Sequence, residues 1–381
     1  MNQQPRDIRA EFRLIDPDKF IDPNVTANGE ARASVALDVL DTFWINTGTL
    51  CNITCAHCYI ESSPTNDRLA YFAHSDATAL FDEIAELGLK TREIGFTGGE
   101  PFMNPDIVSM LDDALGRGFD VLVLTNAMQP MLRPRIKQAL LELNERYPGK
   151  LSLRVSVDHY TQELHEAERG PGSWAKTIQG LDWLSENGFK IAIAGRTCWG
   201  ELEDSERAGY ASLIEMHGWA IDPADPSQLV LFPEMNDRID VPEITTECWG
   251  ILGKKPSDIM CASSRMAVKR KGDDKPAILP CTLLPYDDGF EMGSTLAEML
   301  HDGMRRVLDL ERRFLELRVH RMPDELRADQ GLGVPFPVVF WIAARSVDAE
   351  ERSTGFDPAA ESISLGVVQD ISTRLEPDHG I

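Results

Sequence analysis

Short apolar runs alternate with longer amphipathic stretches from residue 41 to residue 232, and this rhythm constrains the fold more than any other feature. Between the runs, residues 76–87 and 173–187 carry apolar side chains at helical spacing. Parallel strands need a long crossover between them, so alternating strands and helices predict an α/β fold on a parallel sheet. The six runs predicted as strands are 43–46, 93–97, 121–125, 152–157, 190–196 and 229–232.

Four polar or cysteine-rich motifs each follow the carboxyl end of a different predicted strand. In parallel barrels the chemistry lies on the loops that leave these strand ends, so we expect the motifs to face one mouth. In chain order they are Cys51-Asn-Ile-Thr-Cys55-Ala-His57-Cys58, Gly98-Gly99-Glu100-Pro101, Thr125-Asn126 and Ser156-Val157-Asp158.

The first motif offers three thiolates, from Cys51, Cys55 and Cys58, within eight residues. A structural zinc site normally needs a fourth Cys or His from a nearby knuckle, and His57, between two of the cysteines, is poorly placed to serve. Three cysteines suit an iron–sulfur cube that keeps one iron open.

The cysteine loop and the glycine turn together resemble the radical S-adenosylmethionine (radical SAM) family. The family pattern is CxxxCxxC with an aromatic ring before the last cysteine, followed by GGEP, and both occur here in that order. The resemblance covers residues 41–235 and implies a partial (β/α)6 TIM-type barrel. It also implies that Cys51, Cys55 and Cys58 hold a 4Fe-4S cluster whose open iron binds the methionyl group of SAM.

The resemblance further implies contacts to SAM. It assigns the ammonium group to the segment Gly98, Gly99 and Glu100, and the adenine to His57 and Tyr59. Ser156 and Asp158 resemble the contacts to the ribose or the methionyl end, and their side chains, two residues apart on a strand, point the same way. Asn126, at the end of the third predicted strand, is a further candidate for contact with SAM.

Two arginines compete for the SAM carboxylate. Arg169 matches an arginine that meets this carboxylate in relatives, whereas Arg196 ends the fifth predicted strand. Arg169 can also be read as a surface residue before a helix.

The remaining cysteines suggest a second site. Cys248, Cys261 and Cys281 resemble the start of a SPASM or twitch module, which binds an auxiliary iron–sulfur cluster. No cysteine follows Cys281, so at most one such cluster, a second 4Fe-4S, is expected. Cys198 is either its fourth ligand or a residue that faces the substrate. Ordinary buried thiols and a zinc site stay open as alternatives.

We expect four segments. Residues 1–40 are an N-terminal extension, 41–235 the radical SAM barrel, 236–320 a small cysteine-containing C-terminal domain of twitch type, and 321–381 a tail that is polar from Ser353. Residues 294–319 are predicted as a charged helix.

Composition limits the partners and the compartment. The 62 acidic against 38 basic side chains give a formal charge of −24, which repels nucleic acid and anionic lipid, and Lys269 to Lys271 form only a short basic run. There is no signal peptide and no run long enough to span a bilayer. Seven cysteines without an export signal indicate reduced thiols, so we expect a cytoplasmic protein without nucleic-acid or membrane partners.

These observations predict an oxidoreductase or maturase. It would cleave SAM reductively to a 5′-deoxyadenosyl radical and abstract hydrogen from a peptide or small molecule, with electrons from a donor such as flavodoxin or ferredoxin. Glu234 and Asp237, after the sixth strand, are candidate bases for a two-electron oxidation. The alternatives are a non-catalytic iron–sulfur or zinc protein in electron transfer or regulation, and a radical SAM methyltransferase that uses Cys198.

Overall fold

The computed structural model describes residues 18–22, 24–233 and 242–302 of the chain. Within them one sheet has the strand order β6-β5-β4-β3-β2-β1-β7-β8. Strands β1 to β6 pair with their chain neighbours in parallel, β7 pairs in parallel with β1, and β8 is antiparallel to β7. The bounds are β1 Thr42–Asn46, β2 Glu93–Thr97, β3 Asp120–Thr125, β4 Leu151–Ser156, β5 Lys190–Thr197, β6 Leu229–Pro233, β7 Ser264–Val268 and β8 Ala277–Leu279.

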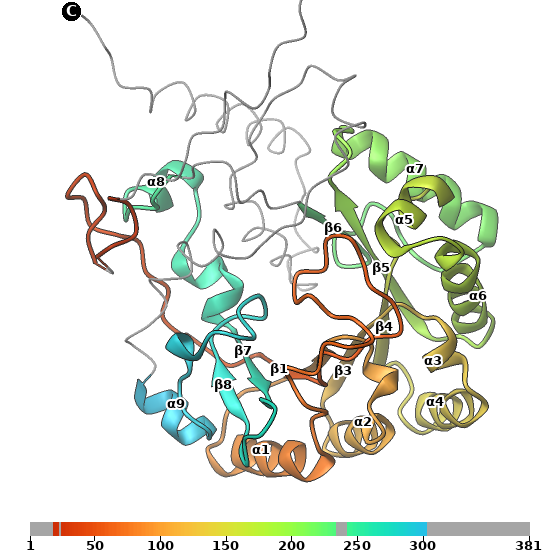
Figure 1. Ribbon diagram of the computed structural model, residues 1–381, viewed down its shortest axis with the longest axis horizontal. Helices are drawn as coiled ribbons and strands as arrows, with labels where there is room; N and C mark the ends of the chain where they lie inside the picture. The colour runs from red at the N-terminus through yellow and green to blue at the C-terminus, as the bar shows by residue number, and fades with distance from the viewer. Residues whose placement is uncertain (1–17, 23, 234–241, 303–381) are drawn as a thin grey trace, which may run out of the picture.

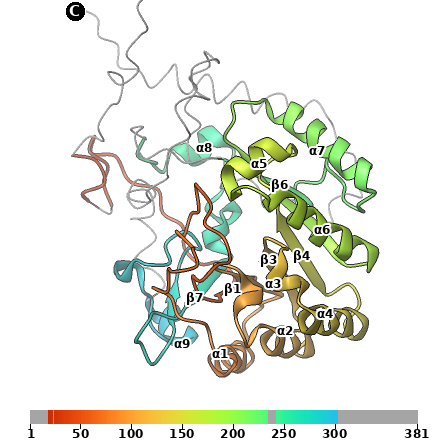
Figure 2. The same cartoon turned by 45° about the vertical axis from the view of Figure 1, so that its right-hand side comes forward.

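The helices α1, α2, α4, α6 and α7 lie around the outer side of the curved sheet (Figures 1 and 2). The described helices are α1 His74–Glu86, α2 Ile107–Gly116, α3 Gln129–Leu132, α4 Pro134–Arg146, α5 Gln162–Arg169, α6 Ser173–Glu186, α7 Glu203–His217, α8 Cys248–Leu252 and α9 Leu296–Asp302. Short 3-10 turns lie at Pro101–Met103, Pro256–Asp258, Met260–Ala262 and Asp288–Phe290.

This arrangement confirms the predicted α/β fold with a parallel sheet, a partial barrel of TIM type. Each predicted strand overlaps an observed one, with ends that differ by a residue at most. The helices predicted at 76–87 and 173–187 are α1 and α6. Of the charged helix predicted at 294–319, α9 is described, and the rest lies outside the described residues.

Strands β7 and β8 were not predicted from the sequence. β7 is buried along its whole length although it contains Ser264 and Arg265, so a polar pair interrupts the apolar run that normally marks a buried strand. Both strands extend the barrel's own sheet beyond β1. The described part of segment 236–320 is therefore continuous with the barrel, and its assignment as a twitch-type domain stays a prediction.

Side chains on alternate positions of β1 fill two cores. Phe43 and Ile45 pack in the large core between sheet and helices, whereas Trp44 lies in a smaller core with Met266 and Cys281. A β-carbon at Gly95 would lie 2.3 Å from the Trp44 ring, so the neighbouring strand must carry glycine there. The smaller core thus joins the C-terminal strands to the inner face of the barrel.

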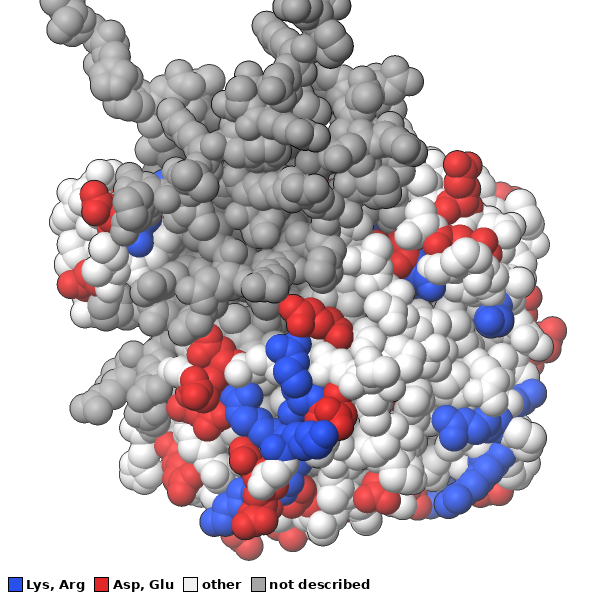
Figure 3. Space-filling view, in the orientation of Figure 1, with Lys and Arg blue, Asp and Glu red and all other residues white. Residues whose placement is uncertain are grey.

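Two surface properties bear on partners. None of the helices in the described residues is long and apolar enough to cross a membrane. On the face in Figure 3, Lys and Arg side chains are interspersed with Asp and Glu rather than collected into one broad basic surface. Lys269, Arg270 and Lys271 pair with Asp76, Glu291 and Asp67 respectively, which neutralises the short basic run.

Candidate functional site

The structure brings the four motifs together at the carboxyl ends of the strands, with the loop after β1 at their centre (Figure 1). The amide N of Gly99 donates to the carbonyl of Gly48 at 2.8 Å, which joins the β2 loop to the β1 loop. The Asn126 side chain, after β3, donates to Asn52 at 2.9 Å. From α5, the carbonyl of Glu168 accepts a hydrogen bond from the amide N of Ala56.

The glycine turn is needed because it touches the backbone that leads into Cys51. Gly98 has a φ of +130°, and a β-carbon there would lie 2.6 Å from the Gly48 carbonyl oxygen. At Gly99 a β-carbon would lie 2.2 Å from the carbonyl oxygen of Leu50. Only glycine allows this approach. The turn therefore positions the cysteine loop directly, and its predicted contact with the SAM ammonium group stays a prediction.

Glu100 links the loops after β2 and β3. Its buried carboxylate accepts hydrogen bonds from the Thr125 hydroxyl at 2.9 Å, the Asn126 amide N at 2.9 Å and the Phe102 amide N at 3.2 Å. Burial raises the pKa of Glu100 to about 6, although the hydrogen bonds oppose this rise. With three donors already bound, the carboxylate has a structural role in addition to the contact with SAM that the sequence predicts.

Asn126 reaches back to the cysteine loop. Its amide nitrogen lies 3.9 Å from Cys51 Sγ, and its carbonyl oxygen accepts from the amide N of Met128. Asn126 is buried, so the end of β3 forms one wall behind Cys51.

The three thiols of the cysteine loop lie close to one another in a poorly solvated place. Burial is the main cause that raises the pKa of Cys51 to about 11 and that of Cys55 to about 12, and the neighbouring thiols contribute to both rises. The Arg169 guanidinium opposes both shifts. Bound iron stabilises a thiolate in the same way as a cation does, so this donor set fits an iron–sulfur cluster.

A single metal ion fits the described residues less well. No three of their His, Cys, Asp and Glu side chains are arranged to hold one ion. A cube takes one thiolate on each of three irons, so its ligands need not converge on a point. None of the seven cysteines, all of which lie in the described residues, forms a disulfide.

Asp158 and Arg169, both predicted to contact SAM, pair with each other beside the thiols. Arg169 Nη2 donates to Asp158 Oδ1 at 3.0 Å, and Arg169 Nε lies 2.5 Å from Oδ2. Burial alone would raise the pKa of Asp158, but Arg169 and Arg196 outweigh it and hold that pKa below its usual value. The pair is therefore charged, and Ser156 lies half-buried at the end of β4 near it.

Glu168 is a site residue that the sequence analysis missed. Its carboxylate accepts from the His57 amide N at 2.8 Å and lies 2.5 Å from His57 Nδ1. Burial would raise the pKa of Glu168, but the hydrogen bond to His57 and the charge of Arg196 keep it low. A signal was present, since His165 and Glu168, three residues apart on α5, share its buried face.

Arg196 lies on the other side of the same loop. Its Nη2 donates to the His57 carbonyl at 2.5 Å, and its guanidinium lies 4.7 Å from the centre of the Tyr59 ring. Its Nε is 3.6 Å from Asp158 Oδ1. Arg196 therefore contacts the cysteine loop directly, whereas the charge of Arg169 interacts with the Cys55 thiol, and the choice between them for the SAM carboxylate stays a prediction.

The second set of cysteines is only partly assembled. Cys261 and Cys281 are buried and hydrogen-bonded to each other, and the bond from Cys281 together with Arg265 lowers the pKa of Cys261. Cys248 instead contacts the Thr245 hydroxyl at 3.6 Å. Cys198 is half-buried after β5. The candidate bases Glu234 and Asp237 lie outside the described residues.

Arg265 stands beside the Cys261 and Cys281 pair, and no carboxylate in the described part of the chain forms a salt bridge with it. Its Nη1 donates to the carbonyls of Cys261 and Ser264, whereas Nε and Nη2 have no hydrogen-bond partner among the described residues. Burial lowers the pKa of Arg265 to about 10, and the two thiols oppose this shift.

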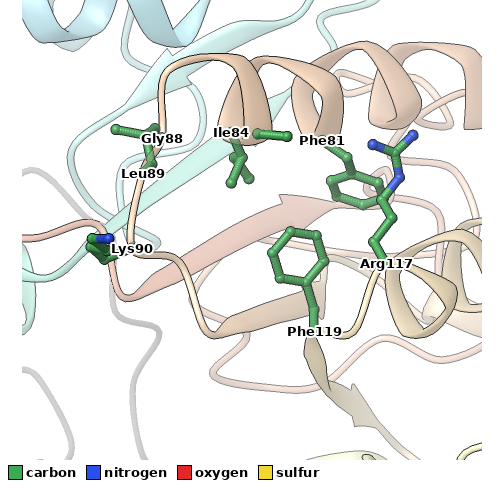
Figure 4. A pocket seen from close by; sticks show the side chains of 8 residues that line it. Phe81, Ile84, Gly88, Leu89, Lys90, Arg117 and Phe119 are labelled. Carbon is green, nitrogen blue, oxygen red and sulfur yellow. The ribbon is translucent and has the colours of Figure 1, made fainter.

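A cavity of about 480 Å³ lies at the opposite end of the strands, before β2 and β3 (Figure 4). Phe81 and Phe119 line it together with Lys90 and Arg117, and Arg117 is already paired with Asp82 and Asp113. None of the predicted site residues lines this cavity.

The comparisons with known proteins agree with the motifs. Residues 45–211 match the model of the radical SAM superfamily. The chain is 34% identical over 145 residues to the antilisterial bacteriocin subtilosin biosynthesis protein AlbA of Bacillus subtilis, covering 38% of this chain and 30% of AlbA. It is 27% identical over 172 residues to the mycofactocin maturase MftC of Mycobacterium ulcerans, covering 44% of this chain and 42% of MftC.

A third relative is an AdoMet-dependent heme synthase of Methanosarcina barkeri, 29% identical over 144 residues, 38% of each chain. The chain thus spans less than half the length of each of these relatives. Streptococcus suis SuiB bound to its precursor peptide SuiA is a structural neighbour at a TM-score of 0.48 and 13% identity, covering 72% of this chain and 65% of SuiB. The matched domain spans the cysteine loop, the glycine turn, Asp158 and Arg169, so residues 45–211 are similar to the radical SAM domain.

Proposed function

We propose that this protein is a radical SAM enzyme of the maturase type. The observation that carries the proposal is the convergence of Cys51, Cys55 and Cys58 with the Asp158–Arg169 ion pair at one mouth of the sheet. When bound, the 4Fe-4S cluster and SAM supply an electron transfer into the sulfonium and a 5′-deoxyadenosyl radical that abstracts hydrogen from the substrate.

The chain's own residues supply position and charge. The three cysteines would hold the cluster, and Arg169 offsets negative charge beside Cys55. Asp158 orients Arg169 through two contacts, so the guanidinium is fixed before a carboxylate ligand arrives. Burial of Asn126, His57 and Asp158 keeps water away from the mouth.

A peptide is the substrate we favour over a small molecule. Two relatives, a bacteriocin biosynthesis protein and a mycofactocin maturase, support this choice, whereas the heme synthase supports the alternative. Glu234 and Asp237 keep their predicted role as bases. A small electron-transfer protein such as a flavodoxin or ferredoxin would reduce the cluster.

An auxiliary cluster at Cys261 and Cys281 is a further part of this proposal. A buried Arg265 with two N–H-bearing nitrogens lacking hydrogen-bond partners in the described residues supports it, because an anionic cluster would compensate the charge. Cys248 would have to approach from α8 as a third ligand.

The test is anaerobic reconstitution with iron and sulfide, followed by dithionite and SAM. Production of 5′-deoxyadenosine by the wild type and by Cys198→Ala, but not by Cys55→Ala, is the expected result. Iron near eight per chain, falling to near four in Cys261→Ala, would support the auxiliary cluster. A fully loaded, reducible protein that forms no 5′-deoxyadenosine with any peptide or small-molecule candidate would favour the non-catalytic alternative.

A further inference from the structure

The backbone between Cys55 and Cys58 is held by one residue of α5. The Glu168 carbonyl accepts from the Ala56 amide N at 2.8 Å, and the Glu168 carboxylate accepts from the His57 amide N at 2.8 Å. The same carboxylate lies 2.5 Å from His57 Nδ1. Glu168 thus binds two consecutive amides and one side chain of the loop.

Arg196 holds the loop from β5. It donates to the His57 carbonyl at 2.5 Å, lies over the Tyr59 ring and stands 3.9 Å from Glu168 Oε1. His57, Glu168 and Arg196 are exposed by only 6%, 4% and 6%. Buried charges are retained where they are paired and hydrogen-bonded, and here both charges bind the loop as well as facing each other.

The position of this set links two parts of the site. Glu168 precedes Arg169, which pairs with Asp158 beside Cys55. One turn of α5 therefore holds the cysteine loop through one residue and the predicted partner of the SAM carboxylate through the next. A shift of this turn would move the cluster ligands relative to the SAM site.

We propose that Glu168 and Arg196 form a clamp that positions the cysteine loop, and that Glu168 orients the His57 ring toward bound SAM. The orientation of the His57 ring toward SAM rests on the proposed function, whereas the clamp on the cysteine loop is a property of the apoprotein. Glu168 is a positioning residue, because it acts through His57 and the loop backbone.

The test compares Glu168→Gln with Glu163→Gln, which removes an exposed carboxylate from the same helix. In the apoprotein, iodoacetamide labelling of Cys55 and Cys58, followed by mass spectrometry, should be about tenfold faster in Glu168→Gln than in Glu163→Gln or wild type. In the reconstituted protein the SAM dissociation constant should rise about 10–100-fold, and the change that SAM causes in the EPR spectrum of the reduced cluster should be lost. Labelling rates and SAM affinity within about twofold of wild type would overturn the clamp.

A double variant tests whether Glu168 acts through the ring. His57→Phe keeps an aromatic face but lacks Nδ1, so Glu168→Gln should weaken SAM binding by no more than about twofold in that background. Additive losses would overturn the orienting role. If Glu168→Gln does not fold, Arg196→Gln removes the other half of the clamp, the contact to the His57 carbonyl, and wild-type labelling of Cys55 and Cys58 in it would overturn the proposal.

The labelling experiment needs neither cluster nor SAM. Faster labelling in Glu168→Gln therefore supports the clamp even if the wild type forms no 5′-deoxyadenosine, which would count against the proposed function alone. Unchanged labelling with normal 5′-deoxyadenosine formation in the wild type would remove the clamp and leave the proposed function intact.

Discussion

The two cysteine sites each place a buried arginine beside thiols, but they balance its charge differently. Arg169 pairs with the Asp158 carboxylate, whereas the nearby groups that oppose the burial of Arg265 are the thiols of Cys261 and Cys281. Burial lowers the pKa of both guanidiniums, and in Arg169 the charge of Asp158 more than reverses this. In the described residues, the first arginine therefore has a carboxylate partner, and the second has only the two thiols to oppose its burial.

The largest effect should come from removing the carboxylate of the complete site. Asp158→Asn leaves Arg169 buried without its counter-charge, so the free energy of unfolding of the apoprotein should fall by about 3–5 kcal/mol. Urea denaturation measures this. Asp112→Asn, which breaks a solvent-exposed pair with Arg146, should lower the free energy of unfolding far less. An equal loss of unfolding free energy in Asp158→Asn and Asp112→Asn would contradict the view that the buried Arg169 depends on its carboxylate partner.

The backbone of the first site should be nearly as sensitive. Gly99→Ala places a β-carbon 2.2 Å from the Leu50 carbonyl oxygen and should destabilise the protein by about 1–3 kcal/mol while lowering the iron bound at the cysteine loop. Gly250→Ala in α8, where there is open space around the position, is the matched control. It should leave both the stability and the iron bound at the cysteine loop unchanged. Iron analysis and thermal unfolding together check this, and wild-type iron in Gly99→Ala would refute it.

Glu206 is the acidic counterpart of Arg265, because it is a buried carboxyl that makes no salt bridge within the described residues. Both oxygens of Glu206 lack hydrogen-bond partners among the described residues, and burial together with Glu201 and Glu203 raises its pKa to about 8. The pKa of the unfolded carboxyl is near its ordinary value of 4.5, so the stabilising contribution of the protonated form is present below that pH and is lost as pH rises through about 8.

Glu206→Gln should therefore be more stable than wild type by about 2 kcal/mol at pH 8 and nearly equal to it at pH 4.5. Glu215→Gln, at an exposed position on the same helix, should show no such dependence. Denaturation curves across this pH range measure the difference. Parallel pH profiles for wild type and Glu206→Gln would exclude an unpaired buried carboxyl.

The smallest effect should come from the second arginine. Arg265→Met replaces an incompletely compensated buried cation with an apolar chain and should stabilise the apoprotein by about 1 kcal/mol, while reducing any iron bound at Cys261 and Cys281. Arg169→Met should instead destabilise the apoprotein, because Asp158 loses its partner. If Arg265→Met also destabilises the apoprotein, the charge of Arg265 is compensated as well as that of Arg169, which would contradict the proposed difference between the two sites.

The sequence alone determined the six barrel strands, the helices α1 and α6, and the meeting of four motifs at one mouth. Apolar periodicity is local, so strand positions can be read from short windows. Convergence then follows from topology, because parallel strands end at one edge. Strand β7 was not predicted because its first two residues are polar, although it is buried beside β1, and β8 was not predicted because its apolar run is only three residues long.

Only the tertiary structure decided which side chains meet within the site. Glu168 and Arg196 contact His57 across 111 and 139 residues of chain; the helical spacing of His165 and Glu168 marks a buried face of α5, but no local pattern identifies His57 as the partner. The same holds for Glu100 with Thr125 and for Cys261 with Cys281. The periodicity of apolar residues predicts which face of a helix or strand is buried. The hydrogen-bond partner of each buried polar side chain depends instead on how the elements pack against one another.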